Sequence, residues 1–400
     1  MTALLPDLET PCLLLDETRM QHNILRMQSR MNELGVAFRP HAKTSKCADV
    51  VRAQIAAGAR GITVSTLKEA EQFFAAGIND ILYAVAIVPS KFDHALRLIR
   101  AGLRLTLLLD SVETATQLSA HGQAQGVVYQ VLIEIDTDGH RSGIAPEDPR
   151  LLAVASALTN VDRSDHIQPD AQRVDQGGGS RAGAHLAGVM THAGSSYALN
   201  TPEALAAMAE QERSGCVRAA QRLREAGHDC RVVSVGSTPT ALSARSLQGV
   251  TEVRAGVYVF FDLVMAGTGV CTPTDVALSV LCSVIGHRPE AGWIITDAGW
   301  MAMSRDRGTH KQAHDHGYGQ VCDLQGRPIA QLAFNDANQE HGVLHWDGDL
   351  QADLAERFPI GSLLRIVPNH ACATGAQHDG YRVLDAQGRI RDTWPRFSGW

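Results

Sequence analysis

The chain has 400 residues, of which 44% are hydrophobic, and its formal net charge is −7. A chain of this length and composition can bury a large core, so we expect a globular protein of two domains. The acidic balance excludes a basic field that would attract nucleic acid or anionic lipid, and no apolar run reaches the roughly 18 residues that a bilayer span needs. These features predict a protein that acts on small molecules, without a nucleic-acid or membrane partner.

The N-terminal segment 1–7 has no basic stretch followed by an apolar core, so the sequence predicts no cleaved secretion signal and a cytoplasmic location. The eight cysteines are scattered, without the paired short spacings of a zinc ribbon or a redox dithiol. Most of them are expected to be small buried residues.

Up to residue 262, short runs rich in Val, Ile and Leu alternate with longer amphipathic stretches. This alternation predicts parallel strands that are joined by crossover helices. The first helix is predicted at 18–34, where apolar residues recur at spacings of three and four. Eight strand–helix units predict an α/β fold, a TIM-like (β/α)8 barrel over residues 17–262. The predicted strands are 36–38, 61–64, 80–84, 104–109, 128–135, 186–190, 231–235 and 252–259.

After residue 262 the pattern changes to strands separated by turns, with little helical periodicity. Strands are predicted at 276–285, 292–296, 362–367 and 381–385. The opening segment 10–16 also resembles a strand, but it precedes the first helix and would be a ninth barrel strand. We therefore expect residues 1–16 and 263–400 to form a second, mainly antiparallel β domain. Residues 162–184 are rich in polar and small residues and predict a flexible insertion.

Polar side chains follow the predicted barrel strands, where barrels of this kind gather their functional groups. Lys43 comes shortly after the first strand, and a lysine there is either a surface charge or a covalent catalyst. Small-residue turns at 236–240 and 254–258 follow neighbouring strands and resemble phosphate-binding loops, and His192 follows the sixth strand. Together they indicate a pyridoxal-phosphate site. The candidate cofactor ligands are Lys43, His41, His192, Gly236, Ser237, Thr238, Arg254, Gly256, Val257 and Tyr258.

In the predicted β domain, His370 and Cys372 are two positions apart. In an extended segment both side chains would point to one face, and imidazole with thiolate suits Zn²⁺. The alternative is a loop histidine near a buried cysteine. No third ligand is evident.

Five segments resemble the fold-type III pyridoxal-phosphate enzymes of the D-serine dehydratase and D-threonine aldolase group, whose barrel is of the alanine racemase type. The resemblance implies that Lys43 binds the cofactor covalently. It also implies that His370 and Cys372 hold a divalent metal (Zn²⁺, or Mn²⁺, Mg²⁺ or Co²⁺) and that the substrate is a D-amino acid with a β-hydroxyl. The segments that carry the resemblance are 39–46, 188–192, 252–258, 339–342 and 368–372.

Other roles are also implied by the resemblance. Arg254 corresponds to an arginine that faces the pyridine nitrogen, and His192 to a histidine that stacks on the ring. Arg141 corresponds to an arginine that contacts the cofactor's phenolic oxygen or a substrate carboxylate, and a structural ion pair is the alternative. Tyr197 and Tyr318 are candidates for the substrate pocket.

Two motifs, His370-X-Cys372 and Lys43-Thr44, resemble those of the dehydratase branch, which includes D-threo-3-hydroxyaspartate dehydratases. Ser45 departs from the motif of that branch. We therefore expect a lyase that removes water and then ammonia from D-serine, D-threonine or 3-hydroxy-D-aspartate to give a 2-oxo acid. A retro-aldol cleavage of the D-threonine aldolase type is the main alternative. An amino-acid racemase and a non-catalytic pyridoxal-phosphate carrier are two more.

The histidine-rich run 310–316 also invites a metal interpretation, but such loops are usually solvated. Relatives in this group are monomers or homodimers, and the sequence leaves both states open.

Overall fold

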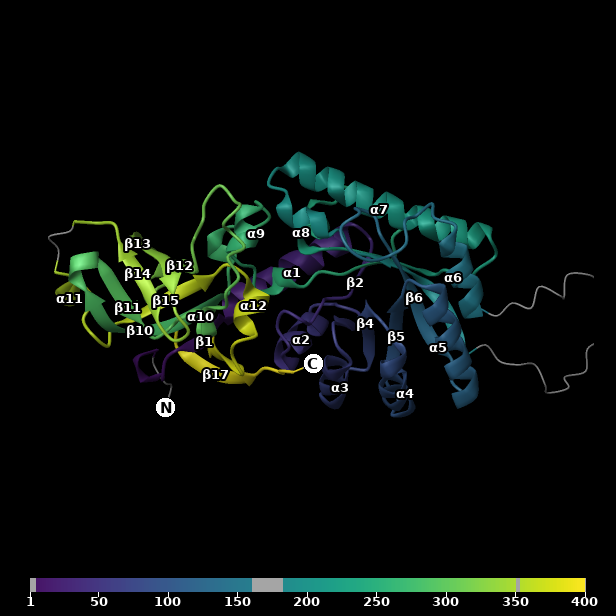
Figure 1. Cartoon of the computed structure of the whole chain (residues 1–400), viewed down its shortest axis with the longest axis horizontal. Coiled ribbons are helices and arrows are strands. Elements are labelled where there is room, and N and C mark those ends of the chain that lie inside the picture. Colours follow the sequence, from purple (N-terminus) through teal and green to yellow (C-terminus); the bar gives the residue numbers. More distant parts are fainter. Residues whose placement is uncertain (1–4, 160–182, 350–352, 400) are drawn as a thin grey trace, which may run out of the picture.

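The computed structural model describes residues 5–159, 183–349 and 353–399, which form two lobes (Figure 1). One lobe is built on an eight-stranded parallel sheet with the order β2-β9-β8-β7-β6-β5-β4-β3. The gap between its first and last strands is bridged by backbone hydrogen bonds from Thr63 N to Pro40 O (2.8 Å) and from Arg60 N to Phe38 O (2.7 Å). The strands are β2 (Ala37–Phe38), β3 (Ile62–Val64), β4 (Asp80–Ala86), β5 (Arg104–Leu109), β6 (Tyr129–Ile135), β7 (Ala184–Thr191), β8 (Val232–Val235) and β9 (Glu252–Val253).

Helices connect these strands and cover the outside of the barrel. The helix predicted at 18–34 is confirmed as α1, in which Met20, Ile24, Met27 and Met31 are buried. The Asp16 side chain accepts a hydrogen bond from Arg19 N and so caps the start of α1. The helices of this lobe are α1 (Glu17–Glu33), α2 (Ala48–Ala56), α3 (Leu67–Ala75), α4 (Phe92–Arg100), α5 (Val112–Gln125), α6 (Arg150–Thr159), α7 (Pro202–Glu225) and α8 (Thr238–Ser243). Helix α9 (Leu263–Gly267) follows the last barrel strand and is joined to the second lobe, because Val264 N donates to Asn369 O (3.1 Å).

The second lobe is a nine-stranded sheet with the order β11-β14-β13-β12-β15-β10-β1-β16-β17. The N-terminal strand β1 lies inside this sheet, antiparallel to β10 and parallel to β16. Its strands are β1 (Cys12–Asp16), β10 (Leu278–Arg288), β11 (Trp293–Thr296), β12 (Gly319–Cys322), β13 (Pro328–Ala337), β14 (Gly342–Trp346), β15 (Leu363–Pro368), β16 (Gly380–Leu384) and β17 (Ile390–Pro395). Three short helices accompany them: α10 (Trp300–Met303), α11 (Leu354–Arg357) and α12 (Ala371–Gly375).

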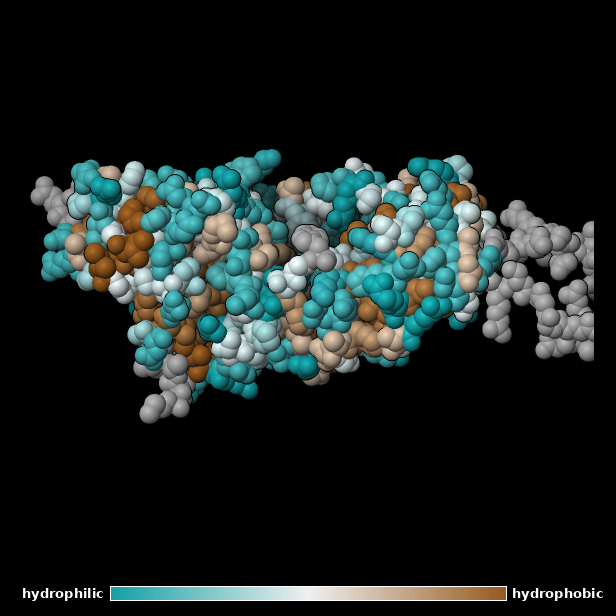
Figure 2. Space-filling model, turned by 60° about the horizontal axis from the view of Figure 1, so that its bottom comes forward, coloured by the Kyte–Doolittle hydropathy of each residue, from teal (hydrophilic) through white to brown (hydrophobic). Residues whose placement is uncertain are grey.

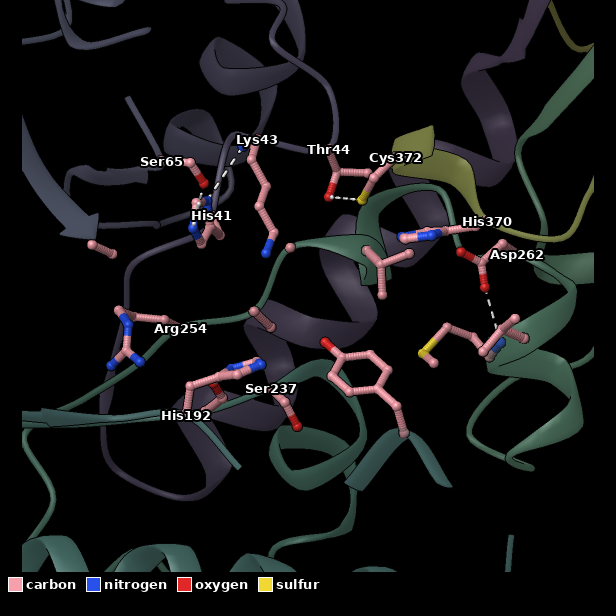
Figure 3. Close-up of a pocket in the computed structure, with 18 of the residues that line it drawn as sticks. His41, Lys43, Thr44, Ser65, His192, Ser237, Arg254, Asp262, His370 and Cys372 are labelled. Atoms are coloured by element: carbon pink, nitrogen blue, oxygen red, sulfur yellow. Dashed lines mark hydrogen bonds between the residues drawn. The ribbon is translucent and has the colours of Figure 1, made fainter. Parts of the chain in front are cut away.

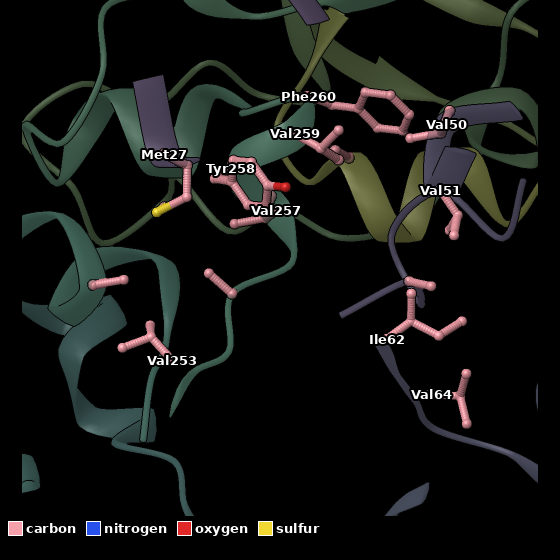
Figure 4. Packing of buried hydrophobic residues seen from close by; sticks show 14 of the residues in the cluster. Met27, Val50, Val51, Ile62, Val64, Val253, Val257, Tyr258, Val259 and Phe260 are labelled. Carbon is pink, nitrogen blue, oxygen red and sulfur yellow. The ribbon is translucent and has the colours of Figure 1, made fainter. Parts of the chain in front are cut away.

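One predicted strand is wrong in length. The run 252–259 forms only the two-residue strand β9, and Val257–Val259 is a 3-10 helix, η5. The apolar residues of η5 are buried against α1 and α2 rather than in a sheet (Figure 4). Burial alone does not tell a strand from a short buried helix. Of the predicted insertion 162–184, only residues 183 and 184 are described, and Ala184 begins β7.

On the face shown in Figure 2, hydrophilic residues cover most of both lobes, with smaller hydrophobic patches between them. Among the described helices, none has the length and apolar character needed to cross a membrane.

Candidate active site

A cavity of about 500 Å³ lies at the C-terminal ends of the barrel strands, and residues from both lobes line it (Figure 3). The Lys43 side chain extends into the space between Arg254 and His192 on one side and Cys372 and His370 on the other. Residues that are more than 300 positions apart in sequence therefore share one cavity. The predicted site residues that line it are His41, Lys43, Arg141, His192, Tyr197, Gly236, Ser237, Arg254, Gly256, Val257, His370 and Cys372.

Three predicted site residues, Thr238, Tyr258 and Tyr318, are not among the residues that line this cavity. The Tyr258 side chain is fully buried, with its hydroxyl 2.7 Å from Gln54 Nε2, and the Thr238 hydroxyl accepts a hydrogen bond from Tyr258 N. Tyr318 packs on Phe334, with a distance of 5.5 Å between the ring centroids. Tyr258 belongs to the 3-10 turn η5, whose side chains are buried.

The loop that carries Lys43 is fixed by the second lobe and the C-terminal tail. Tyr381 donates its hydroxyl hydrogen to Ser45 O (2.6 Å), and Phe397 N donates to Lys46 O (2.7 Å). Inside the barrel, His41 Nδ1 accepts a hydrogen bond from Lys43 N (3.3 Å). The lysine therefore projects from a backbone that is held from both sides.

His41 and His192 are neutral imidazoles in a cationic surrounding. Burial, followed by Lys43 and Arg254, holds the pKa of His41 well below its ordinary value. Burial and then Arg141 lower the pKa of His192 to about 3, and His192 Nδ1 donates to Gly236 O at 2.9 Å. An uncharged, oriented ring is suited to stacking on an aromatic cofactor.

Arg254 is buried and held by a polar chain through the barrel. Its guanidinium donates to Ser234 Oγ (2.7 Å) and to Thr191 O (2.5 Å). Ser234 Oγ in turn donates to Glu252 Oε1 (2.6 Å), and Arg39 Nε donates to Glu252 Oε2 (3.0 Å). Because its donors are fixed in this way, Arg254 presents one orientation to the cavity.

The two predicted phosphate turns differ in their free donors. Gly236 has φ +130°, and a Cβ there would lie 2.2 Å from Arg254 O, so the turn requires glycine. However, Gly236 N donates to the buried Glu212 carboxylate (3.1 Å), and the Ser237 hydroxyl caps α8 by accepting from Thr240 N. These groups are thus engaged within the protein.

In the turn at Gly256 and Val257, the backbone N–H groups are available to a ligand. No hydrogen bond from either N–H to another residue in the described part of the chain is present, and both residues line the cavity. A Cβ at Gly256 would lie 3.1 Å from His41 O, so glycine keeps this backbone close to the Lys43 loop. Two free N–H groups beside an amine and an arginine fit a phosphorylated cofactor.

The His370–Cys372 pair lies in a helical turn, so the extended segment expected there is wrong. Strand β15 ends at Pro368, and α12 begins at Ala371 with His370 as its N-cap. The two side chains nevertheless interact with each other. Burial disfavours ionisation of both groups. For His370 the hydrogen bond with Asp306, followed by the contact with Cys372, outweighs the burial, and for Cys372 the contact with His370 does so. The pKa of His370 rises to about 11 and that of Cys372 falls. Imidazole and thiolate are soft ligands that a divalent cation can bind.

Several residues that line the cavity were not predicted from the sequence, among them Thr44, Asp262 and Asp306. Thr44 Oγ1 lies 3.2 Å from Cys372 Sγ, and Asp306 Oδ2 lies 2.5 Å from His370 Nδ1. The buried Asp262 caps α9 and accepts a hydrogen bond from Ala371 N (2.9 Å). Asp262 is followed by a short helical run, which is an N-cap signal. Asp306 comes from an irregular loop and has no such signal.

Two other predictions concern Arg141 and the histidine-rich run 310–316. Arg141 is half exposed, and its nearest carboxylate, Glu134, is 4.0 Å away, which leaves the guanidinium available to the cavity. Within residues 5–159, 183–349 and 353–399, no group of three or more His, Cys, Asp or Glu side chains is arranged to hold a metal.

Comparison with known proteins gives matches to both lobes. The family described as "Alanine racemase, N-terminal domain" matches residues 15–264, and the one described as "Putative serine dehydratase domain" matches residues 277–384. D-threo-3-hydroxyaspartate dehydratase from Delftia sp. (strain HT23) is 59% identical over 395 residues, which cover 98% of each chain. D-threonine aldolase from Arthrobacter sp. is 29% identical over 389 residues, or 96% of this chain and 91% of that protein. A solved structure of a D-threo-3-hydroxyaspartate dehydratase mutant in the metal-free form is 57% identical, covers 100% of both chains and has a TM-score of 0.92.

Proposed function

Since the chain belongs to the family described as "Alanine racemase, N-terminal domain" and also carries a region that matches "Putative serine dehydratase domain", we propose that it is a D-3-hydroxy amino acid dehydratase. It removes water and then ammonia from the substrate and releases a 2-oxo acid. The identity of 59% over almost the full length to a D-threo-3-hydroxyaspartate dehydratase supports 3-hydroxy-D-aspartate as the first substrate to test.

The observation that carries this proposal is the shared cavity of Lys43 and the His370–Cys372 pair. Elimination of a β-hydroxyl needs a base at Cα and an acid at the β-oxygen. Lys43 supplies an amine, and the pair supplies two metal ligands from the other lobe. A barrel that only carried pyridoxal phosphate would not need the His370–Cys372 pair.

The residues present fit both groups that the reaction requires. Lys43 would hold pyridoxal phosphate, with the Gly256 and Val257 N–H groups at its phosphate and Arg254 and His192 against its ring. His370 and Cys372 would hold a divalent cation, for which the thiolate favours Zn²⁺. When bound, the cofactor supplies an electron sink for the charge left on Cα, and the cation supplies a Lewis acid for the departing hydroxyl.

Lys43 has two tasks in this account. It would anchor the cofactor, and as a free amine its Nζ would take the proton from Cα of the substrate. The fixed backbone of residues 41–46 keeps the amine at one wall of the cavity. Arg141 is suited to a carboxylate of the substrate or to the phenolic oxygen of the cofactor.

Aldol cleavage is the second candidate, because a D-threonine aldolase is 29% identical over 96% of this chain. That reaction breaks the Cα–Cβ bond and needs no base at Cα. Incubation with D-serine, D-threonine and 3-hydroxy-D-aspartate, with and without a chelator, separates the two reactions. Ammonia with a 2-oxo acid supports the dehydratase, whereas glycine with an aldehyde product would replace it by the aldolase.

A further inference from the structure

We propose that Asp306 is a positioning residue of the metal site, which orients His370 so that its Nε2 binds the cation. This inference rests on the proposed function, because it assigns a partner to the proposed metal ligand. Asp306 belongs to the loop between α10 and β12, far from His370 in the sequence.

The contact is a short hydrogen bond on one particular ring nitrogen. Asp306 Oδ2 lies 2.5 Å from His370 Nδ1, and a carboxylate can only accept there, so Nδ1 carries the hydrogen. In the neutral imidazole that metal binding requires, the lone pair is then on Nε2. Histidine ligands of metals are commonly oriented in this way, by a carboxylate on the nitrogen that does not bind the metal.

Asp306 is itself fixed to the segment that carries His370. The buried Asn369, which precedes His370, donates from Nδ2 to Gly317 O (2.7 Å) and to Asp306 O (3.4 Å). Thr309 Oγ1 donates to Asn369 Oδ1 at 3.2 Å. The loop 304–317 and the start of α12 are therefore joined at several points, and the carboxylate and the imidazole are held as one unit.

Asp306 is not placed to bind the cation as a third ligand. Its oxygen is on the Nδ1 side of the ring, and the two ring nitrogens point away from each other. In the described parts of the chain, Asp306 also forms no group of three ligands with His370 and Cys372. The carboxylate thus acts on the cation through His370.

The same loop offers a matched control. Asp315 has a similar exposure to Asp306, at 39% against 37%, but it pairs with Arg307 at 2.9 Å and is not among the residues that line the cavity. Asp315 Oδ1 accepts hydrogen bonds from Gly317 N (2.9 Å) and Thr309 Oγ1 (3.4 Å). The variant Asp315→Asn keeps an oxygen for these bonds, removes the same charge from the same loop and does not touch His370.

The experiment titrates Co²⁺ into holoenzyme that keeps pyridoxal phosphate but has been stripped of metal, with a chelator as competitor. We expect Asp306→Ala to bind Co²⁺ about 10- to 100-fold more weakly than the wild type and to change its visible spectrum. Asp306→Asn is expected to be intermediate, because the amide oxygen still accepts from Nδ1–H. Asp315→Asn should stay close to the wild type.

The absorbance of bound pyridoxal phosphate shows whether each variant is folded. If Asp306→Ala does not fold, the comparison is made with Asp306→Asn. Wild-type affinity and spectrum in the Asp306 variants, or an equal loss in Asp315→Asn, would overturn the inference. His370→Ala separates this outcome from failure of the metal site itself. If His370→Ala also keeps full affinity, the proposed metal pair is wrong; if it alone loses the metal, only the role of Asp306 is wrong.

Discussion

The hydroxyl of Thr44 lies 3.2 Å from the sulfur of Cys372, although the two residues are 328 positions apart. Thr44 directly follows Lys43 on the barrel, and Cys372 belongs to α12 in the other lobe. One contact therefore links the loop of the proposed base to the proposed metal ligand. The packing of the two lobes therefore fixes the position of the Lys43 loop relative to Cys372.

Replacement Thr44→Val should weaken metal binding. The valine keeps the shape of threonine but cannot donate to the Cys372 thiolate, and a hydrogen bond to a charged group contributes about 1.5 kcal/mol, or roughly tenfold in affinity. The measurement is a chelator titration of the metal. Thr44→Ser restores the hydroxyl and should restore the affinity; equal affinity in Thr44→Val would show that this contact has no role.

Removal of the metal should stop elimination but leave the cofactor in place. His370 and Cys372 lie on the α12 side of the cavity, whereas Lys43 and the Gly256 turn belong to the barrel. After chelation we expect loss of ammonia release with unchanged pyridoxal-phosphate absorbance, and recovery on addition of Zn²⁺, Mn²⁺ or Co²⁺. Full activity in the chelated enzyme would contradict a catalytic cation.

Glu212 should make stability depend on pH. Burial raises its pKa above the ordinary value of 4.5, although Thr240 and the N–H groups of Ala193 and Gly236 oppose the shift. A carboxyl with a raised pKa favours the folded state while protonated, so the wild type loses stability as pH rises above about 4.5 toward the folded pKa. Glu212→Gln does not titrate and should gain stability relative to the wild type over this range.

Urea unfolding of both proteins at about pH 5 and about pH 8 checks this difference. Glu210→Gln is the contrasting variant, because Arg213 lowers the pKa of Glu210. Its stability relative to the wild type should fall, not rise, as pH increases from the acid range. If the difference in unfolding free energy between Glu212→Gln and the wild type does not change with pH, burial does not raise the pKa of Glu212.

The sequence predicts the barrel well, because each strand is a short apolar run and each run is followed by a polar end. It also predicts Lys43, His370 and Cys372 as site residues, since these belong to local motifs. It does not predict Asp306 or Thr44, whose roles depend on contacts between segments that are distant in the chain. Strand β9 is overestimated because the buried turn η5 continues its apolar run. Strands β12, β13, β14 and β17 are not predicted. Much of β13 and β17 is exposed, so they lack a clear apolar face, and β12 and β14 are short buried runs without a distinct strand pattern.

The central claim is that Lys43 is both the anchor of the cofactor and the base at Cα. The most direct test is the analysis of products from 3-hydroxy-D-aspartate with wild-type enzyme and with Lys43→Ala at equal concentration. The account predicts ammonia and a 2-oxo acid from the wild type, and loss of both the cofactor absorbance and the turnover in the variant. Full turnover by Lys43→Ala, or glycine as the product of the wild type, would contradict it.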